Sequence, residues 1–237
     1  MTLSNIKSVF QRVEVKYMVE EATYPILMER LKEHMDIDSY GLHTICNIYY
    51  DTEHDELIRT SLEKPIYKEK LRLRSYGVPT ESSKVFLEIK KKYKGIVYKR
   101  RMDLDLASAK EFTLHNIPPE GESQIQKEVE YFLKFYKPVP KVYIAYDRIA
   151  MFGKEDPELR ITFDQNIRSR DYDLNLEDGD HGELLLKEGF RLMEIKIAGA
   201  MPLWLSAILN ELAIYPTSFS KYGNVYKKKL RETIGGN

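Results

Sequence analysis

Residues 68–76 have the sequence Lys-Glu-Lys-Leu-Arg-Leu-Arg-Ser-Tyr, in which cations and leucines alternate from Lys70 to Arg74. Successive side chains of a β-strand point to opposite faces, so Lys70, Arg72 and Arg74 share one face while two leucines occupy the other. An ordinary half-buried strand presents a mixed, solvated polar face, whereas several strands that each present cations suggest a surface built around a polyanion. The stretch therefore predicts a β-strand with a face suited to phosphate groups.

Similar alternation predicts further strands along the chain. Strands are expected over residues 9–18, 44–52, 68–76, 84–93, 97–103, 141–152, 159–168 and 191–198. Eight antiparallel strands can close a barrel, and barrels of roughly 200 to 250 residues commonly form one domain. We therefore predict a β-dominated α+β fold, an eight-stranded antiparallel closed β-barrel with peripheral helices and a C-terminal helix, in a single domain over residues 1–237.

Helical patterns separate some of these strands. Helices are expected after Thr23, near Asp55, over residues 107–114 and 122–136, from Pro202 through Ile214, and over residues 221–234. The first is expected to bury an apolar stripe of Ile26, Leu27, Leu31 and Met35. The helix over 122–136 is expected to carry Ile125, Val129, Phe132 and Phe135 at helical spacing. The acidic, glycine-containing residues 171–183 predict an exposed loop.

The charge of the chain is balanced overall but not along the strands. It has 37 basic and 37 acidic residues, with 43% hydrophobic residues, as expected of an ordered globular protein. On the predicted inward strand faces, however, thirteen basic residues accompany four acidic ones. The remaining surface is then acidic, which discourages nucleic-acid binding and steers small anions toward the openings. We expect no nucleic-acid partner.

Other sequence features bear on location and on alternative chemistry. Cys46 is the only cysteine and lies in an apolar run, so we expect a buried thiol in a reducing compartment. The sequence has no signal-peptide pattern, and no stretch approaches the roughly 18 apolar residues of a membrane span. We expect a soluble, cytoplasmic protein, with any membrane coupling left to a separate membrane-protein partner. The five histidines lack zinc spacing, and the glycines form no P-loop or dinucleotide fingerprint.

Repetition of the charged rows is the main functional signal. One such row is weak evidence, because a solvated edge strand gives the same pattern. The rows are Arg12-Glu14-Lys16, Lys70-Arg72-Arg74, Glu88-Lys90-Lys92, Lys99-Arg101, Arg148, Arg160-Asp164 and Glu194-Lys196. Arginine binds phosphate oxygens bidentately and lysine supplies a flexible point charge, so the mixture suits a phosphate chain. Burying these groups without an anion would be costly.

An ordered set of short motifs spans nearly the whole chain. The motifs are RVEVKY at 12–17, IYYDT at 48–52, KLRLRSYG at 70–77, FLEIKKKYKG at 86–95, YDR at 146–148, RITFD at 160–164, MEIK at 193–196 and FSKYG at 219–223. In this set the sequence resembles the triphosphate tunnel metalloenzymes. It resembles more closely the VTC domain, the polyphosphate polymerase module of the vacuolar transporter chaperone complex and its bacterial relatives. The resemblance implies an eight-stranded tunnel that binds a nucleoside triphosphate or polyphosphate with a divalent metal.

The resemblance also implies roles for individual residues. The catalytic phosphate-binding set would be Lys16, Arg72, Arg74, Lys90, Arg148 and Lys196, with Lys221 as a further phosphate ligand. The strand faces add expected substrate contacts at Arg12, Lys70, Lys92, Lys99, Arg101, Tyr146 and Arg160. Glu194 would be the principal metal ligand, with Glu14, Glu88 and Asp164 as candidate supporting ligands. Mn²⁺ or Mg²⁺ suits such an oxygen-rich site.

One departure from the wider superfamily bears on the reaction. Its hydrolytic members carry Glu-x-Glu-x-Lys on the first strand, whereas this chain has Arg12 at the first glutamate position. A cation there disfavours two-metal activation of water and favours transfer of phosphate to phosphate. The favoured function is a polyphosphate polymerase that uses ATP. A tripolyphosphatase or nucleoside triphosphatase of the same fold, and a noncatalytic polyphosphate-binding module, are the alternatives.

Overall fold

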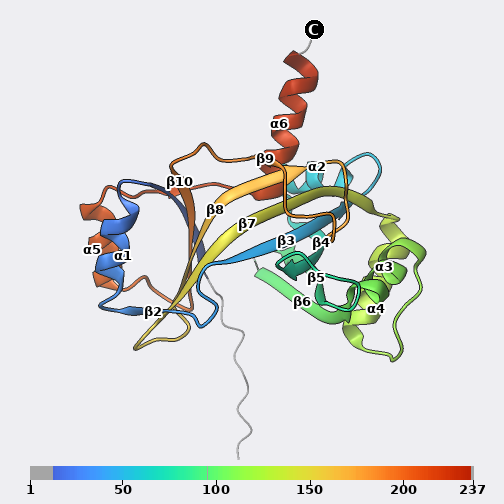
Figure 1. The fold of residues 1–237 in the computed structure, drawn as a ribbon, viewed down its shortest axis with the longest axis horizontal. Coiled ribbons are helices and arrows are strands. Elements are labelled where there is room, and N and C mark those ends of the chain that lie inside the picture. Colours follow the sequence, from blue (N-terminus) through green and yellow to red (C-terminus); the bar gives the residue numbers. More distant parts are fainter. Residues whose placement is uncertain (1–12, 95, 236–237) are drawn as a thin grey trace, which may run out of the picture. The chain divides into compact units, whose positions relative to one another are not determined.

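The computed structural model describes residues 13–94 and 96–235 (Figure 1). Arg12 and the start of the strand predicted over residues 9–18 lie outside the described residues. The strands are β1 (Val13–Glu20), β2 (Met35–Ile37), β3 (His43–Asp51), β4 (Tyr67–Tyr76), β5 (Lys84–Tyr93), β6 (Ile96–Asp105), β7 (Val139–Gly153), β8 (Arg160–Arg170), β9 (Glu183–Leu184), β10 (Phe190–Ile197) and β11 (Pro216–Thr217). The helices are α1 (Tyr24–Leu31), α2 (Glu56–Leu62), α3 (Leu106–His115), α4 (Gln124–Tyr136), α5 (Leu203–Glu211) and α6 (Lys221–Gly235).

The described strands form one open antiparallel sheet. Its order is β11-β1-β10-β8-β7-β3-β4-β5-β6, with β2 paired to β7 and β9 paired to β8. The outer strands β11 and β6 are not paired with each other in the described part of the chain, so the sheet of 11 strands is not closed. The β-dominated α+β class, the antiparallel pairing and the C-terminal helix are confirmed, whereas the closed eight-stranded barrel is wrong. The three strands beyond the predicted set, β2, β9 and β11, have only two or three residues, too few to show alternation in the sequence.

The chain folds into two compact units. Among the described residues, the first comprises 13–42, Arg148–Gln165 and Lys187–Ser218, and the second comprises 43–94, 96–147, Asn166–Leu186 and 219–235. Each unit has its own buried apolar cluster. That residues 1–237 act as a single domain stays a prediction.

In the first unit, β1, β8 and β10 bury one face and leave the other polar. Alternate residues of these strands pack against α1 and α5, which lie side by side (Figure 1). Arg30 on α1 pairs with Glu211 at the end of α5, with 2.9 Å between guanidinium and carboxylate. The prediction that Met35 continues the α1 stripe is wrong, because the helix ends at Leu31 and Met35 begins β2. The spacing from Leu31 fits a helix, but the chain turns between them, with the His34 amide donating to the Leu31 carbonyl at 3.0 Å.

In the second unit, the apolar face of β3 to β6 packs against α3 and α4 (Figure 1). Ser123 caps α4 by accepting a hydrogen bond from the Gln126 amide at 3.1 Å. Phe135 has helical spacing from the buried Val129 and Phe132, but its side chain is 63% exposed and stacks on Tyr131. The buried face of α4 consists of Gln126, Val129, Phe132 and Leu133. It therefore includes a polar residue that a search for apolar residues at helical spacing passes over.

Two other sequence predictions concern buried residues. Cys46 is buried and forms no disulfide, as predicted. The exposed loop predicted over residues 171–183 is wrong at Leu176, which is fully buried in the apolar cluster of the second unit. Arg170 donates to the backbone carbonyls of Asp173 at 3.1 Å and His181 at 2.6 Å, which holds this acidic segment to the sheet. In the described part of the chain, no helix has the length and apolar character needed to cross a membrane.

Asp51 joins three elements of the second unit. Its buried carboxylate accepts hydrogen bonds from the amides of Leu57 at 2.8 Å and Ile58 at 2.9 Å, at the beginning of α2. It also accepts one from the hydroxyl of Tyr222 on α6 at 2.8 Å. Helix N-termini leave amides without intrahelical partners, and Asp51 supplies the acceptors that the α2 cap residue does not.

We expect Asp51→Ala to reduce the free energy of unfolding by about 3 kcal/mol, because it leaves several buried donors without an acceptor. Tyr222→Phe removes one of these hydrogen bonds and is expected to cost about 1 kcal/mol. Urea denaturation of both variants measures the difference. Equal losses for the two variants would contradict the helix-capping role of Asp51.

Candidate functional site

The second unit presents a row of cations on the face opposite its apolar cluster. The register sets Arg72 of β4 beside Glu88 of β5, and Glu88 beside Arg101 of β6. Nine cations share this face of the three strands with the carboxylates of Glu88, Asp103 and Asp105: Lys68, Lys70, Arg72, Arg74, Lys84, Lys90, Lys92, Lys99 and Arg101. The leucines between them point into the core. The alternation seen at residues 68–76 thus extends over neighbouring strands.

Glu88 lies at the centre of this face and is 2% exposed. One of its oxygens, Oε2, accepts from Arg72 Nε at 2.6 Å and lies 3.9 Å from Arg74 Nε. The other, Oε1, is 2.8 Å from Lys99 Nζ. One buried carboxylate on β5 therefore bridges cations from the two neighbouring strands, β4 and β6.

The charge of Glu88 is fixed by these neighbours. Burial alone would raise the pKa of Glu88, but Arg72, Arg74 and Lys99 outweigh that effect and lower the pKa from 4.5 to about 2. The cations also act on one another: partial burial lowers the pKa of Lys68, and the nearby charges of Lys92 and Lys90 lower it further. The positive charge is therefore concentrated around Glu88, away from Asp103 and Asp105 at the end of β6.

Acid titration should reveal the contribution of Glu88 to stability. Because its pKa in the folded protein lies below its ordinary value, the stabilisation is present above pH 4.5 and is lost as the pH falls toward 2. A lowering of the Glu88 pKa by this amount corresponds to roughly 3 kcal/mol of the free energy of unfolding. We expect Glu88→Gln to be less stable than the wild type at pH 6 and to approach it near pH 2 to 3, measured by chemical denaturation across this range. A constant gap between the two proteins would contradict this account.

Neutral polar side chains orient the two arginines. Arg72 Nη1 donates to the hydroxyl of Tyr49 at 3.1 Å, and Arg74 Nη2 donates to the hydroxyl of Tyr146 at 3.2 Å. Arg74 Nε donates to Asn47 Oδ1 at 2.9 Å, and Asn47 is itself fully buried. These neutral contacts orient both guanidinium groups and add no negative charge to that of Glu88.

Lys221, the first residue of α6, completes the cluster of the second unit. Its ammonium lies 4.3 Å from the centre of the Tyr146 ring, a cation–π contact. The next residue, Tyr222, is anchored on Asp51. The FSKYG segment thus holds one lysine beside the side chain that contacts Arg74.

A second charged face lies in the first unit. Register pairs Lys16 with Glu194 and Glu14 with Lys196, so the four side chains form a square of alternating charge. Lys16 Nζ lies 3.6 Å from Glu14 Oε1 and 3.7 Å from Glu194 Oε2, and Lys196 Nζ lies 2.5 Å from Glu194 Oε1. The opposite face of these strands is the apolar core.

The neighbouring strands of the first unit extend this face. Arg148 binds Asp164 through two hydrogen bonds, Nε to Oδ1 at 2.6 Å and Nη2 to Oδ2 at 2.8 Å. Thr162 lies opposite Glu194 in the register, and its buried hydroxyl oxygen has no hydrogen-bond partner among the described residues. Arg160, opposite Lys196, is exposed. Asp164 is thus engaged by a guanidinium, which leaves Glu14 and Glu194 as the carboxylate pair.

The donors of the first unit fit a hard divalent cation that also takes ligands from phosphate. No group of three or more His, Cys, Asp or Glu side chains that could hold a metal ion occurs in the part of the chain that the structure describes. Mg²⁺ and Mn²⁺, however, are commonly bound by one or two carboxylates together with substrate phosphates and water. Glu14 and Glu194 both pair with the Lys16 ammonium and supply carboxylate oxygens for a metal. The Thr162 hydroxyl, which has no hydrogen-bond partner among the described residues, is a further oxygen opposite Glu194.

The two units divide the predicted site residues between them. Arg72, Arg74, Lys99, Tyr146 and Lys221 gather around Glu88 and its neighbours in the second unit. Lys16, Lys196 and Glu194 gather in the first. Lys70, Lys90 and Lys92 share the cationic face, and Arg101 lies over the Phe86 ring at 4.4 Å.

Sequence reasoning missed four polar residues of these faces. They are Asn47, Tyr49, Lys68 and Thr162. Lys68 has the same alternation as Lys70 and could have been found from that pattern. The others carry no charge, so the search for cation rows passed over them.

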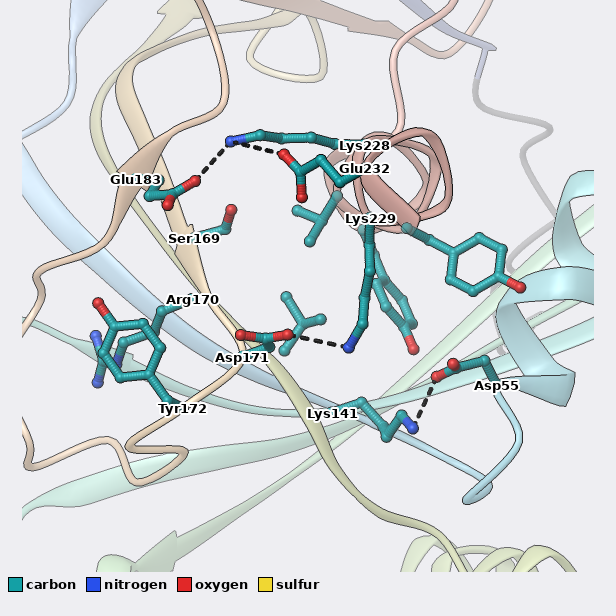
Figure 2. A pocket seen from close by; sticks show the side chains of 14 residues that line it. Asp55, Lys141, Ser169, Arg170, Asp171, Tyr172, Glu183, Lys228, Lys229 and Glu232 are labelled. Atoms are coloured by element: carbon teal, nitrogen blue, oxygen red, sulfur yellow. Dashed lines mark hydrogen bonds and ion pairs between the residues drawn. The ribbon is translucent and has the colours of Figure 1, made fainter. Parts of the chain in front are cut away.

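A separate small pocket lies between α6 and the end of β8 in the second unit (Figure 2). Its volume is about 140 Å³. Lys229 is paired with Asp171 at 3.0 Å, Lys141 with Asp55 at 3.0 Å and Lys228 with Glu183 at 2.6 Å. These ion pairs balance the charge of its lining, so it does not share the positive character of the strand face.

Comparison with known proteins places the chain in a family. The VTC domain model matches residues 11–229. A candidate adenylate cyclase from Vibrio parahaemolyticus has 12% identity and a TM-score of 0.52 over 91% of this chain and 97% of that one. A candidate adenylate cyclase from Bacillus halodurans has 14% identity and a TM-score of 0.55 over 89% and 95%.

A third solved structure has an activity in its description. It is a candidate adenylyl cyclase from Hippeastrum with a dominant triphosphatase activity, with 15% identity and a TM-score of 0.52 over 89% of this chain and 93% of that one. At these identities the likeness establishes the fold alone. A comparison with curated proteins gave no match. The resemblance indicated by the ordered motifs is confirmed, and because the family model covers nearly the whole sequence, the chain belongs to the VTC domain family.

Proposed function

We propose that this protein is a metal-dependent polyphosphate polymerase, which transfers the γ-phosphate of ATP to the end of a growing polyphosphate chain. Membership of the VTC domain family supports an enzyme that acts on triphosphates. The polymerase reaction is the finer part of the proposal, and it rests on the VTC-like motif order and on Arg12 in the first-strand motif. The proposed partners are ATP and polyphosphate.

The observation that carries the proposal is the cationic face of the second unit. Nine cations on three neighbouring strands outnumber the three carboxylates of the same face, Glu88, Asp103 and Asp105, which favours binding of an anion with several charges. Arg72 and Arg74 are oriented by Tyr49 and Tyr146, which gives them the fixed geometry that bidentate phosphate binding requires. We propose that these arginines, with Lys90, Lys99 and Lys221, bind consecutive phosphates.

The charged square of the first unit has a different proposed role. Lys16, Lys196 and Arg148 would bind phosphate oxygens, while Glu194, supported by Glu14, would hold Mn²⁺ or Mg²⁺. When bound, the metal would neutralise developing charge on the phosphate oxygens. No protein nucleophile is needed, because positioning and charge neutralisation supply most of the catalysis of phosphoryl transfer.

Hydrolysis is the second candidate. The fold likeness to the Hippeastrum protein with a dominant triphosphatase activity favours it equally. In that case water, instead of a phosphate chain end, accepts the phosphoryl group, and the same basic residues would bind the substrate. A noncatalytic polyphosphate-binding module is the remaining alternative, and a cytoplasmic location with a separate membrane-protein partner stays a prediction.

Gel analysis of the products separates these functions. The purified protein is incubated with ATP and Mn²⁺, and in parallel with tripolyphosphate and Mn²⁺. A ladder of lengthening chains from ATP supports the polymerase. Orthophosphate as the only product supports the hydrolase, and tight polyphosphate binding in calorimetry without turnover under several metals supports the binding module.

A further inference from the structure

We infer that Glu88 acts as a built-in competitor of the substrate, a carboxylate that occupies Arg72 and Lys99 in the free protein and gives them up when a phosphate binds. The inference rests on the proposed function, because it requires that the cationic face of the second unit binds phosphate. It changes the role considered for Glu88 from supporting metal ligand to regulator of phosphate affinity.

The contacts of Glu88 resemble those expected of a bound anion. Oε2 of Glu88 lies 2.6 Å from both Nε and Nη2 of Arg72. Oε1 lies 2.8 Å from the ammonium nitrogen of Lys99. These are the short, charge-assisted interactions that arginine and lysine form with phosphate oxygens. A phosphate that approaches this face meets cations whose strongest bonds are already made.

The burial of the partners makes this competition unequal. Glu88 is 2% exposed, whereas the side chain of Lys99 is 47% exposed and that of Arg72 is 23% exposed. The carboxylate is therefore fixed in the wall, while its cationic partners reach the surface from which a ligand arrives. Lys99 in particular can turn toward an incoming phosphate without unfolding the strand.

Competition of this kind weakens binding but preserves the fold. Without Glu88, Arg72, Arg74 and Lys99 would repel one another in the free protein, which is a cost that a bound phosphate would remove. With Glu88 present, that cost is already relieved, so phosphate gains less by binding. The expected consequence is faster release of a long polyanion from a face that would otherwise hold it tightly.

The test measures tripolyphosphate binding by calorimetry without metal, for the wild type and three variants. Glu88→Gln removes the charge, and Glu88→Asp keeps it. The matched control is Glu128→Gln, since Glu128 also bridges two cations of β5 and β6, Lys91 at 3.2 Å and Arg100 at 3.0 Å, but on the opposite face. All four proteins bind the same probe under the same ionic strength.

We expect Glu88→Gln to bind tripolyphosphate about tenfold more tightly than the wild type, because one opposing charge beside the ligand is gone. Glu88→Asp and Glu128→Gln should stay close to the wild type. If Glu88→Gln does not fold alone, tripolyphosphate should restore its cooperative thermal unfolding transition, since the ligand replaces the missing anion.

The opposite outcomes are distinct from one another. Equal or weaker binding by Glu88→Gln, or an unfolded variant that tripolyphosphate does not restore, would overturn the competitor role and leave a purely structural one. An equal gain in affinity in Glu128→Gln would attribute the effect to net charge and would also overturn it. Failure of the wild type itself to bind tripolyphosphate would overturn the proposed function, and the inference with it.

Discussion

Arg72→Ala is expected to reduce turnover of ATP by at least about hundredfold, because the variant loses a charge-assisted, oriented contact with the phosphate chain. Arg72 is held by Glu88 and by the Tyr49 hydroxyl, so its position is fixed before any ligand arrives. Preorganised groups of this kind lose little free energy to reorganisation on binding. Initial rates of ATP consumption with Mn²⁺ measure the effect.

Arg100→Ala provides the matched control. Arg100 lies on β6 beside Arg101 and pairs with Glu128 on the opposite face of the sheet. Its replacement removes the same charge and a comparable ion pair, so we expect turnover within about threefold of the wild type. Equal losses in the two variants would show that net charge, and not the cationic face, determines activity.

The second large effect is expected at Glu194. Glu194→Gln should lower turnover by about hundredfold or more and raise the Mn²⁺ concentration needed for half-maximal rate, because the amide oxygen is a much poorer ligand than a carboxylate. The amide keeps the size of the side chain, and the neighbouring lysines then lose their common counter-ion. A titration of the rate with Mn²⁺ separates loss of metal affinity from loss of the fold.

Glu21→Gln serves as the comparison for Glu194. Glu21 directly follows the last residue of β1 in the same unit and pairs with Arg191. Its side chain is 62% exposed. We expect its Mn²⁺ dependence to match that of the wild type. If Glu194→Gln also keeps the wild-type Mn²⁺ dependence, Glu194 is not the metal ligand.

The long alternating strands could be predicted from sequence, and the closure of the sheet could not. Residues 68–76 predict β4 because cations and leucines alternate from Lys70 to Arg74, and Lys16 and Glu194 fall on polar faces for the same reason. Whether strands close a barrel depends on the pairing of the outer strands, which leaves no periodic trace in either strand. Short strands such as β2 are fixed by pairing with β7 alone.

The neutral parts of the site illustrate a second limit. Asn47 and Tyr49 lie within a largely buried strand and look like ordinary members of it, yet their polar groups orient Arg74 and Arg72. Cross-strand register brings them together, and register is a tertiary property. Likewise, Glu88 could be assigned to a charged face, but its contacts with three cations arise only when β4, β5 and β6 are paired.

Phosphorus NMR of ATP that has been incubated with the protein and Mn²⁺, recorded after the Mn²⁺ has been removed, tests the central claim most directly, because it identifies the product as well as the consumption of substrate. The account predicts that the γ-phosphate signal of ATP declines while a signal of internal polyphosphate phosphates grows, and that Arg72→Ala abolishes both changes. Orthophosphate as the only new signal would contradict phosphate transfer in favour of hydrolysis. An ATP spectrum that stays unchanged with either Mn²⁺ or Mg²⁺ would contradict an enzymatic function altogether.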